Sequence, residues 1–257
     1  MTRFILVASA KGGTGKTTTA LNLAAAMKHF GKDVIVVDAN LNTPNIALQL
    51  GASKLQTTLH DVLRGKKHIT EALYLHNSNL KIIPGSISLN DLNTNPDTLR
   101  LALSALEGIT DFVIIDSAAG LGRETLAAID STDEVIVVTN PEIPAVTDAL
   151  KIIKIAQRLN KQVNGVIVTR TKYSNYELTF KNIETILEKP ILGVIEEDNK
   201  FKIALKKKDI LTNLFPNSKN ANNYKRIAAN LLGENYTEQL KEESFLYHLF
   251  RKFGLIK

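Results

Sequence analysis

The residues best suited to chemistry lie near the start of the chain, where residues 10–18 read AKGGTGKTT. Glycines lack a Cβ, so backbone N–H groups in such a turn can point inward and approach phosphate oxygens closely. A helix that begins here presents its positive end to the same anion. We expect Lys16 to reach the β- and γ-phosphates of a nucleotide, and the Thr17 hydroxyl to ligate Mg²⁺. The predicted nucleotide-binding residues of this loop are Gly12, Gly13, Thr14, Gly15, Lys16, Thr17 and Thr18.

Two aspartates are suited to complete a Mg²⁺ site. Asp38 ends the apolar run VIVVD, and Asp116 ends the apolar run FVIID. In open α/β sheets, ligands bind at the carboxyl ends of the strands, which is where both carboxylates would lie. We therefore predict that Thr17, Asp38 and Asp116 form the metal side of the site, with the carboxylates acting through the water shell of the ion.

The elements that must position these residues are short β-branched runs alternating with longer helical patterns. Near-continuous apolar strands are typical of a parallel sheet buried on both faces, and the alternation favours right-handed crossovers. The predicted fold class is therefore α/β, with a mostly parallel twisted sheet flanked by helices on both faces. The expected strands are residues 3–9, 33–38, 80–84, 111–116, 134–139, 164–169 and 191–195.

Helical patterns lie between and after these runs. The sequence shows no internal repeat and no low-complexity linker, so we expect one domain, residues 1–233, followed by a tail, residues 234–257. The Asn-rich stretch 217–223 is predicted to be a loop. The expected helices are residues 17–30, 97–106, 125–128, 147–159, 176–187 and 224–232.

Composition limits the classes of function. The 257 residues include no cysteine, which excludes disulfides and thiolate metal sites and is typical of a reducing cytoplasm. The sequence contains no run of 18 apolar residues, so it predicts no membrane span. The net charge of +6 comes from residues 198–257, which hold twelve Lys and Arg against six Asp and Glu. The five histidines show no metal-ligand spacing, and we expect them at the surface or in local contacts.

The tail ends in an amphipathic pattern. Five large apolar residues recur at helical spacing and form one stripe, and the other side of the helix carries polar and basic groups. Such a helix could bind an anionic membrane surface weakly, and two tails on a dimer would add avidity. The alternative is that the helix folds back onto the domain or binds a partner helix. The predicted membrane-facing residues are Phe245, Leu246, Leu249, Phe250 and Phe253.

The loop resembles the deviant Walker A motif, KGGxGKT, of the MinD/ParA group of ATPases. In that group the early lysine, here Lys11, reaches the phosphates of the other subunit when ATP lies between two subunits. The resemblance implies an ATP-dependent homodimer with ATP and Mg²⁺ as cofactors. The stretch VTNPEIPAVTDALKII, residues 138–153, is similar to a second conserved segment of MinD proteins.

The first switch segment departs from the family pattern. The family has two aspartates in a D-x-D run, whereas this chain has Asp38, Ala39 and Asn40. The second carboxylate helps to orient the attacking water, and a neutral amide cannot accept a proton. We expect Lys11, Lys16, Asp38 and Asn40 to serve catalysis, and hydrolysis to be slow. A nearly non-hydrolysing, ATP-locked scaffold is the alternative.

The adenine side of the site is also assigned by resemblance. Arg170 matches the second residue of the family's Asn-Arg pair, and Thr169 replaces the first. Glu197 lies in Glu196-Glu197-Asp198, where the family has Pro-Glu-Asp. The resemblance therefore implies that Arg170 and Glu197 bind the nucleotide near its base.

The function implied is that of a MinD-like ATPase that attaches peripherally to the inner face of the cell membrane and helps to position a division site or another structure. An activator protein is a possible partner. The rival is a DNA-partitioning ATPase that uses the basic run 200–208. DNA is the less favoured partner, because the run lacks aromatic interleaving and no helix-turn-helix or zinc signature accompanies it.

Overall fold

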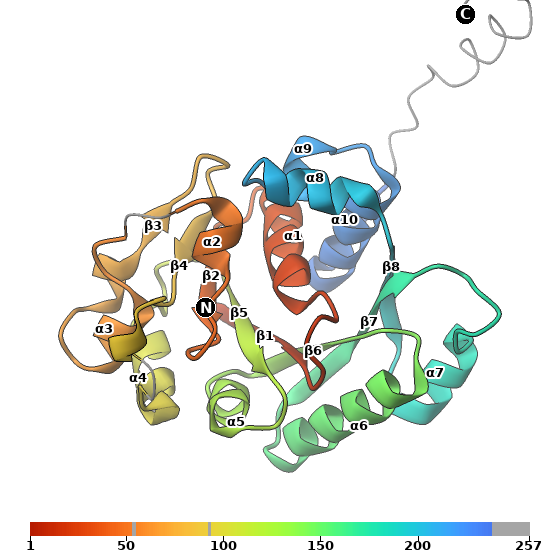
Figure 1. Cartoon of the computed structure of the whole chain (residues 1–257), viewed down its shortest axis with the longest axis horizontal. Helices are drawn as coiled ribbons and strands as arrows, with labels where there is room; N and C mark the ends of the chain where they lie inside the picture. Colours follow the sequence, from red (N-terminus) through yellow and green to blue (C-terminus); the bar gives the residue numbers. More distant parts are fainter. Residues whose placement is uncertain (53–54, 92–93, 238–257) are drawn as a thin grey trace, which may run out of the picture.

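The chain forms one eight-stranded sheet between two layers of helices (Figure 1), in a computed structural model that describes residues 1–52, 55–91 and 94–237. The strand order is β3-β4-β2-β5-β1-β6-β7-β8, and every pair is parallel except β3 with β4. The predicted fold class is confirmed. The strands are β1 (Arg3–Ser9), β2 (Val34–Ala39), β3 (Tyr74–Leu75), β4 (Lys81–Ile83), β5 (Phe112–Ala119), β6 (Glu134–Thr139), β7 (Gln162–Thr171) and β8 (Ile191–Glu196).

Alternate residues of each central strand pack against opposite layers of helices. In β1, Phe4, Leu6 and Ala8 face one core cluster, whereas Ile5 and Val7 face the other. The first cluster includes side chains from α3 to α7, and the second includes side chains from α1, α2 and α10. The near-continuous apolar runs of the strands follow from this burial on both faces.

The helices fill both faces of the sheet and leave its carboxyl edge to the loops (Figure 1). Three short 3₁₀ helices, Ile69–Ala72, Leu89–Asp91 and Pro96–Thr98, complete the described elements. The α-helices are α1 (Lys16–His29), α2 (Ile46–Leu50), α3 (Leu59–Leu63), α4 (Leu99–Ser104), α5 (Arg123–Asp130), α6 (Ile143–Arg158), α7 (Phe180–Leu187), α8 (Asn199–Lys206), α9 (Leu211–Leu214) and α10 (Lys219–Leu232).

The prediction that the Asn-rich stretch is a loop was wrong. Helix α10 begins at Lys219, and the Ser218 side chain caps it by accepting from the Ala221 N–H. The Asn220 side chain accepts from the Glu196 N–H and donates to the Glu196 carbonyl, and Asn223 donates to the Val194 carbonyl. These bonds to β8 override the low helix propensity of asparagine, because they satisfy its amides on the neighbouring strand.

Other expectations needed smaller corrections. The antiparallel edge strand β3 and helices α2, α3, α8 and α9 were missed, since each is too short to show a clear period. Helix α7 begins at Phe180 rather than at residue 176, because the Thr179 side chain caps it there. His60 and His76 are buried rather than at the surface, and His76 makes a local contact with Ser78, which was the other expectation. The described residues include no helix that is long and apolar enough to cross a membrane.

The C-terminal predictions fall largely outside the described part of the chain. Helix α10 ends at Leu232, where Gly233 adopts a left-handed conformation with φ of 70°. Residues Phe245, Leu246, Leu249, Phe250 and Phe253 lie outside the described residues. The division into residues 1–233 and 234–257 therefore stays a prediction.

Candidate functional site

The phosphate loop joins the end of β1 to the start of α1 at the carboxyl edge of the sheet. Gly13 and Gly15 have φ angles of 79° and 88°, a left-handed region that favours glycine. Gly15 is the N-cap of α1, so the first turn of this helix faces the loop. The loop lines a cavity of about 1030 Å³. All the loop residues predicted from the sequence, positions 11–18, line this cavity.

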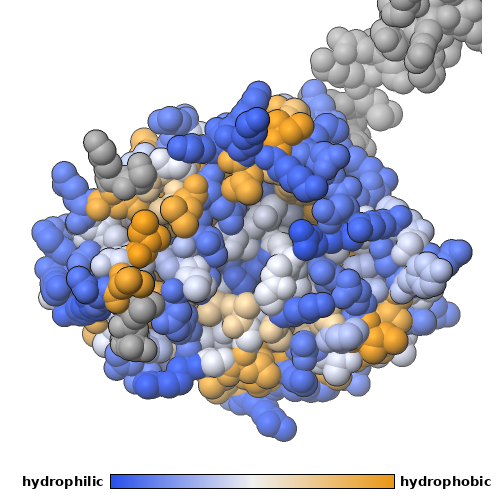
Figure 2. Space-filling model, viewed as in Figure 1, coloured by the Kyte–Doolittle hydropathy of each residue, from blue (hydrophilic) through white to orange (hydrophobic). Residues whose placement is uncertain are grey.

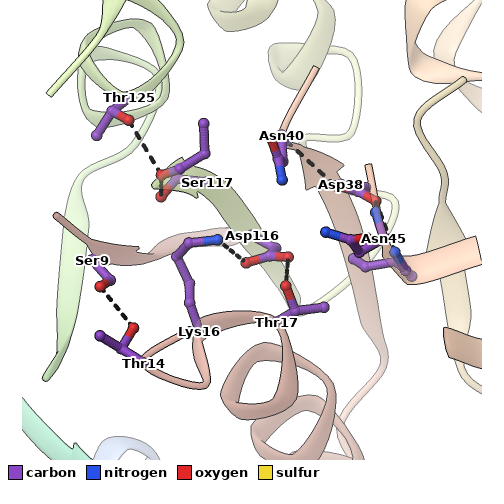
Figure 3. Close-up of polar contacts among 12 residues, drawn as sticks. Ser9, Thr14, Lys16, Thr17, Asp38, Asn40, Asn45, Asp116, Ser117 and Thr125 are labelled. Atoms are coloured by element: carbon purple, nitrogen blue, oxygen red, sulfur yellow. Dashed lines mark hydrogen bonds and ion pairs between the residues drawn. The ribbon is translucent and has the colours of Figure 1, made fainter. Parts of the chain in front are cut away.

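Lys16 and Thr17 both bind Asp116, as Figure 3 shows. The Lys16 Nζ lies 3.0 Å from Oδ1 of Asp116, and the Thr17 hydroxyl donates to Oδ2 at 2.6 Å. Asp116 is fully buried and Lys16 is only 8% exposed. The structure thus brings together the lysine, the hydroxyl and the carboxylate that the sequence assigned to phosphate and Mg²⁺.

Asp38 lies beside Asp116 on the neighbouring strand, but its partners are backbone amides. Its Oδ2 accepts from the N–H groups of Asn45 and Ile46, at 2.9 Å each, and its Oδ1 accepts from the Asn40 N–H at 3.3 Å. The two aspartates are paired in the register of β2 and β5. Burial first, and then the charge of Asp116, raise the pKa of Asp38 to about 7.

This pair of carboxylates fits a divalent cation. Two buried acids on adjacent strands repel each other, and Lys16 supplies one positive charge against them. An added cation would relieve that repulsion, and Thr17 offers a hydroxyl oxygen next to Asp116. Among the described residues, no group of three or more His, Cys, Asp or Glu is placed to hold a metal ion.

Asn40 follows β2 and uses its side chain within its own loop. The amide nitrogen donates to the Thr43 carbonyl at 2.6 Å, and the amide oxygen accepts from the Thr43 hydroxyl at 3.1 Å. The side chain lines the same cavity as the phosphate loop. An aspartate at this position would lack the donor for the Thr43 carbonyl, so the amide has a structural task besides its predicted catalytic one.

Lys11 stands apart from the buried group around Lys16. Its Nζ lies 3.0 Å from Glu142, and both side chains are about half exposed. Glu142 is the N-cap residue of α6 and lies in the connection between β6 and α6. No role for Glu142 could be predicted from the sequence, because a surface ion pair between residues 131 positions apart has no sequence signal.

Arg170 and Glu197 meet on the other side of the loop. The guanidinium donates to the Gly13 carbonyl at 2.9 Å and lies 3.3 Å from the Glu197 carboxylate. A register shift between β7 and β8 falls at Arg170, whose φ of 57° turns this residue out of the strand. Both residues line the cavity, as expected for residues near a bound base.

Thr169 has a supporting position that the sequence did not reveal. Its hydroxyl donates to the Thr14 carbonyl, and it also lies within hydrogen-bonding distance of Asn140. A Cβ on Gly15 would lie 3.8 Å from the Thr169 hydroxyl. Thr169 therefore packs under the phosphate loop and braces it.

The fold and the site define a P-loop ATPase with a deviant phosphate loop. The family description "AAA domain" matches residues 2–169. The chain is 44% identical to an uncharacterized ATP-binding protein of Methanocaldococcus jannaschii over 94% of this chain and 93% of that protein. It is 32% identical to the septum site-determining protein MinD of Thermotoga maritima, over 91% and 89% of the two chains.

Solved structures agree with these relatives. The cell division ATPase MinD of Pyrococcus furiosus has a TM-score of 0.87 and 32% identity, with 91% of this chain and 99% of that chain covered. MinD of Pyrococcus horikoshii, solved with Mg-ADP, has a TM-score of 0.86 and 33% identity, with 90% and 96% covered. The chain belongs to the MinD/ParA family of P-loop ATPases, and it is an ATP hydrolase that uses ATP and Mg²⁺.

Proposed function

We propose that the chain is an ATP-dependent switch that dimerises when Lys11 binds the nucleotide of a second subunit. The observation that carries the proposal is the separation of the two loop lysines. Lys16 is buried against Asp116, whereas Lys11 is half exposed at the cavity and held by one exposed carboxylate. An exposed ion pair contributes little stability, so Lys11 can exchange Glu142 for a phosphate at small cost.

The buried residues have tasks within their own subunit. We infer that Lys16 and the amides of residues 12–18 bind the phosphates, and that Thr17, Asp38 and Asp116 would hold Mg²⁺. When bound, Mg²⁺ neutralises charge on the β- and γ-phosphates. Asp38 and Asn40 position the attacking water at the carboxyl edge of β2. Arg170 and Glu197 bind near the adenine.

Light scattering with ATP and Mg²⁺ tests the role of Lys11. The wild type should double its mass with ATP and stay monomeric with ADP, and Lys11→Ala should stay monomeric with both. Lys154→Ala is the matched control, because Lys154 forms an ion pair with Glu188 at the same distance of 3.0 Å and with similar exposure. A Lys11→Ala protein that still pairs with ATP would refute the proposal.

We further propose that the C-terminal stripe binds anionic membrane and that the protein acts at the inner face of the cell membrane. The support is the stripe of five large apolar residues between Phe245 and Phe253 in the sequence. Figure 2 shows several separate apolar patches on the one face of the described residues that it draws. Vesicles with anionic lipid should sediment the ATP-bound wild type but not Phe250→Glu. Leu101→Glu, which adds the same charge at an exposed position of α4, should sediment normally.

The cellular role follows from the relatives. Septum site-determining and cell division proteins named MinD are similar to this chain over most of its length, which supports a role in positioning a division site or another structure. A MinC:MinD complex of Aquifex aeolicus, 25% identical in the matched chain, supports a partner protein. Purification of the ATP-bound protein with its native partners, compared with the ADP-bound protein, tests for such a partner.

DNA partitioning is the second candidate. Lys202, Lys206, Lys207 and Lys208 are all exposed on or after α8, which favours contact with phosphate groups. Ile203 and Leu205 are exposed among them, which suits DNA less well. Gel shifts with DNA that compare the wild type with Lys206→Glu/Lys207→Glu test this candidate. The double variant Lys66→Glu/Lys67→Glu is the control, because it changes another pair of exposed neighbouring lysines. No ATP-dependent shift in the wild type would exclude this candidate.

The ATP-locked scaffold is tested by the nucleotide that the purified protein carries. The amide at Asn40 gives the reason to expect slow turnover. Chromatography of released nucleotide should give mostly ATP if hydrolysis is nearly absent, and mostly ADP if the protein cycles.

A further inference from the structure

An acid from a different part of the chain holds the middle of the loop between β2 and α2. This loop, residues 40–45, is fixed at both ends by the Asp38 carboxylate. In its middle, the Leu41 N–H donates to Oε2 of Glu124 at 3.0 Å, and the Asn42 side-chain amide donates to Oε1. One carboxylate therefore binds two consecutive residues of the loop.

Glu124 comes from the segment that follows the other acidic strand end. It is the second residue of α5, and this helix begins after the turn that leads away from Asp116. The Thr125 hydroxyl donates to the Ala118 carbonyl at 3.2 Å, so the start of the helix is tied to that turn. A glutamate in the first turn is favoured by the helix dipole. Glu124 therefore links the segment after Asp116 to the segment after Asp38.

The carbonyl of Leu41 is also held by a residue from outside the loop. It accepts from His60 Nε2 at 2.9 Å, and His60 Nδ1 accepts from the Ser86 N–H at 2.9 Å. Because Nδ1 is an acceptor, the ring proton lies on Nε2, which makes His60 the donor to Leu41. Glu124 therefore binds the peptide group that joins Asn40 to Leu41, and His60 binds the peptide group that joins Leu41 to Asn42. With both groups held, the backbone on either side of Leu41 is restrained.

Arg123, the charged residue next to Glu124 in the sequence, bonds to other residues and does not compete for this contact. Arg123 is directed to Asp97, at 3.0 Å, and to Asn95. The Glu124 carboxylate accepts from two neutral N–H donors. Glu124 lines the same cavity as Lys16 and Asn40. Its contacts thus act on the loop that carries the predicted water-positioning residues, at the nucleotide cavity itself.

We propose that Glu124 is a positioning residue for ATP hydrolysis. It locks the loop after β2 to the N-terminus of α5, so that Asn40, which lines the cavity, keeps one arrangement next to Asp38. Glu124 and the loop belong to the same subunit, so the contact between them does not depend on dimerisation. Its effect is expected on the ATPase activity of the chain. Loss of the lock should reduce kcat, because the loop then samples other arrangements. The affinity for ADP should not change, since the phosphate loop, Arg170 and Glu197 are untouched.

Exchange of donor and acceptor between Glu124 and Asn42 provides the test. In Glu124→Gln, an amide nitrogen faces the Asn42 amide, and in Asn42→Asp two carboxylates face each other. The double variant Asn42→Asp/Glu124→Gln restores one donor and one acceptor. We expect kcat to fall about tenfold in each single variant and to return to within about twofold of wild type in the double variant.

Two further measurements separate positioning from a general loss of structure. Amide hydrogen exchange at Leu41 without nucleotide should be faster in each single variant and restored in the double variant. Assays are run below the lowest Tm of the set, and ADP affinity should be equal throughout. The exposed acid variant Glu188→Gln is the control and should match the wild type. A double variant as slow as the slower single one, or unchanged kcat in both single variants, would overturn the proposal.

Discussion

Asp116 and Asp38 lie near the carboxyl ends of neighbouring strands, are both fully buried, and are paired in register, yet they are held in different ways. Asp116 accepts from two side chains of the phosphate loop, Lys16 and Thr17. Asp38 accepts from three backbone amides of the loop that follows it. The first acid therefore links its strand to the nucleotide-binding loop, and the second organises the segment that carries Asn40.

The difference shows what kind of donor a buried carboxylate needs for each task. Side-chain donors can leave Asp116 when phosphate or Mg²⁺ competes for them, so this contact can respond to the nucleotide. Backbone amides in a closed loop cannot leave Asp38 unless the loop unfolds. Burial and the charge of Asp116 raise the pKa of Asp38 to about 7, although the backbone amides of Ile46 and Asn45 act to lower it.

The largest effect is expected from Asp116 itself. Asp116→Asn keeps the shape but removes the charge that binds Lys16 and that we propose helps to hold Mg²⁺. We expect kcat/KM for ATP to fall about a hundredfold or more. Asp148→Asn on α6, an exposed acid paired with Lys151, serves as the control and should change nothing. Comparable activity of the two variants would show that Asp116 is not part of the site.

A matched pair of substitutions sharpens the contrast between side-chain and backbone donors. Thr17→Val removes the hydroxyl that donates to Asp116, and we expect about a tenfold loss of kcat/KM. Asn45→Ala keeps the backbone N–H that donates to Asp38, so turnover should stay within about twofold of wild type. Thr17→Ser retains the hydroxyl and should recover most of the activity. Steady-state phosphate release measures all three, and equal losses at both positions would break the comparison.

The raised pKa of Asp38 predicts the pH dependence of stability. Between its ordinary value of 3.8 and about 7, the folded chain keeps a proton that the unfolded chain has lost. The contribution of Asp38 to the free energy of unfolding is therefore present at low pH and is lost as pH rises through this window. In thermal melts without nucleotide, from about pH 5 to about pH 8, we expect several degrees of Tm to be lost through this group.

Asp38→Asn removes the titrating proton and is the variant that isolates this effect. The slope of Tm against pH should be flatter in the variant than in the wild type, and Asp148→Asn should keep the wild-type slope. Identical slopes for wild type and Asp38→Asn would mean that Asp38 titrates alike in the folded and unfolded chain.

The smallest effect is expected at Asn40, next to Asp38. Asn40→Asp restores the carboxylate of the family pattern but loses the bond to the Thr43 carbonyl. We expect turnover to rise about threefold, because a carboxylate orients water better than an amide. Asn40→Ala, which lacks both functions, should be no faster than the wild type. A fall or no change in Asn40→Asp would count against the water-positioning role of this residue.

The strands could be predicted well, and the reason is their burial on both faces. β1 and β6 have the bounds expected from their apolar runs, and the other predicted strands differ by one to three residues at their ends. The helix α10 could not be predicted in full, because Asn220 and Asn223 are helical through bonds to β8. A stretch whose local propensity opposes its structure is visible only with its tertiary partners in place.

The residues of the site also fall into those that local sequence predicts and those that only tertiary contacts reveal. The spacing of the phosphate loop and the acids at the ends of two apolar runs are local features, so the sequence by itself determined the P-loop, the Lys16–Thr17 pair and the two aspartates. The tertiary structure decided which group binds which. It placed Thr17 and Lys16 on Asp116, gave Asp38 backbone donors, paired Lys11 with Glu142, and brought Glu124 to Leu41. Apart from the donors of Asp38, which are local, these partners lie far apart in the sequence. Only the register of parallel strands brings their loops to one edge of the sheet.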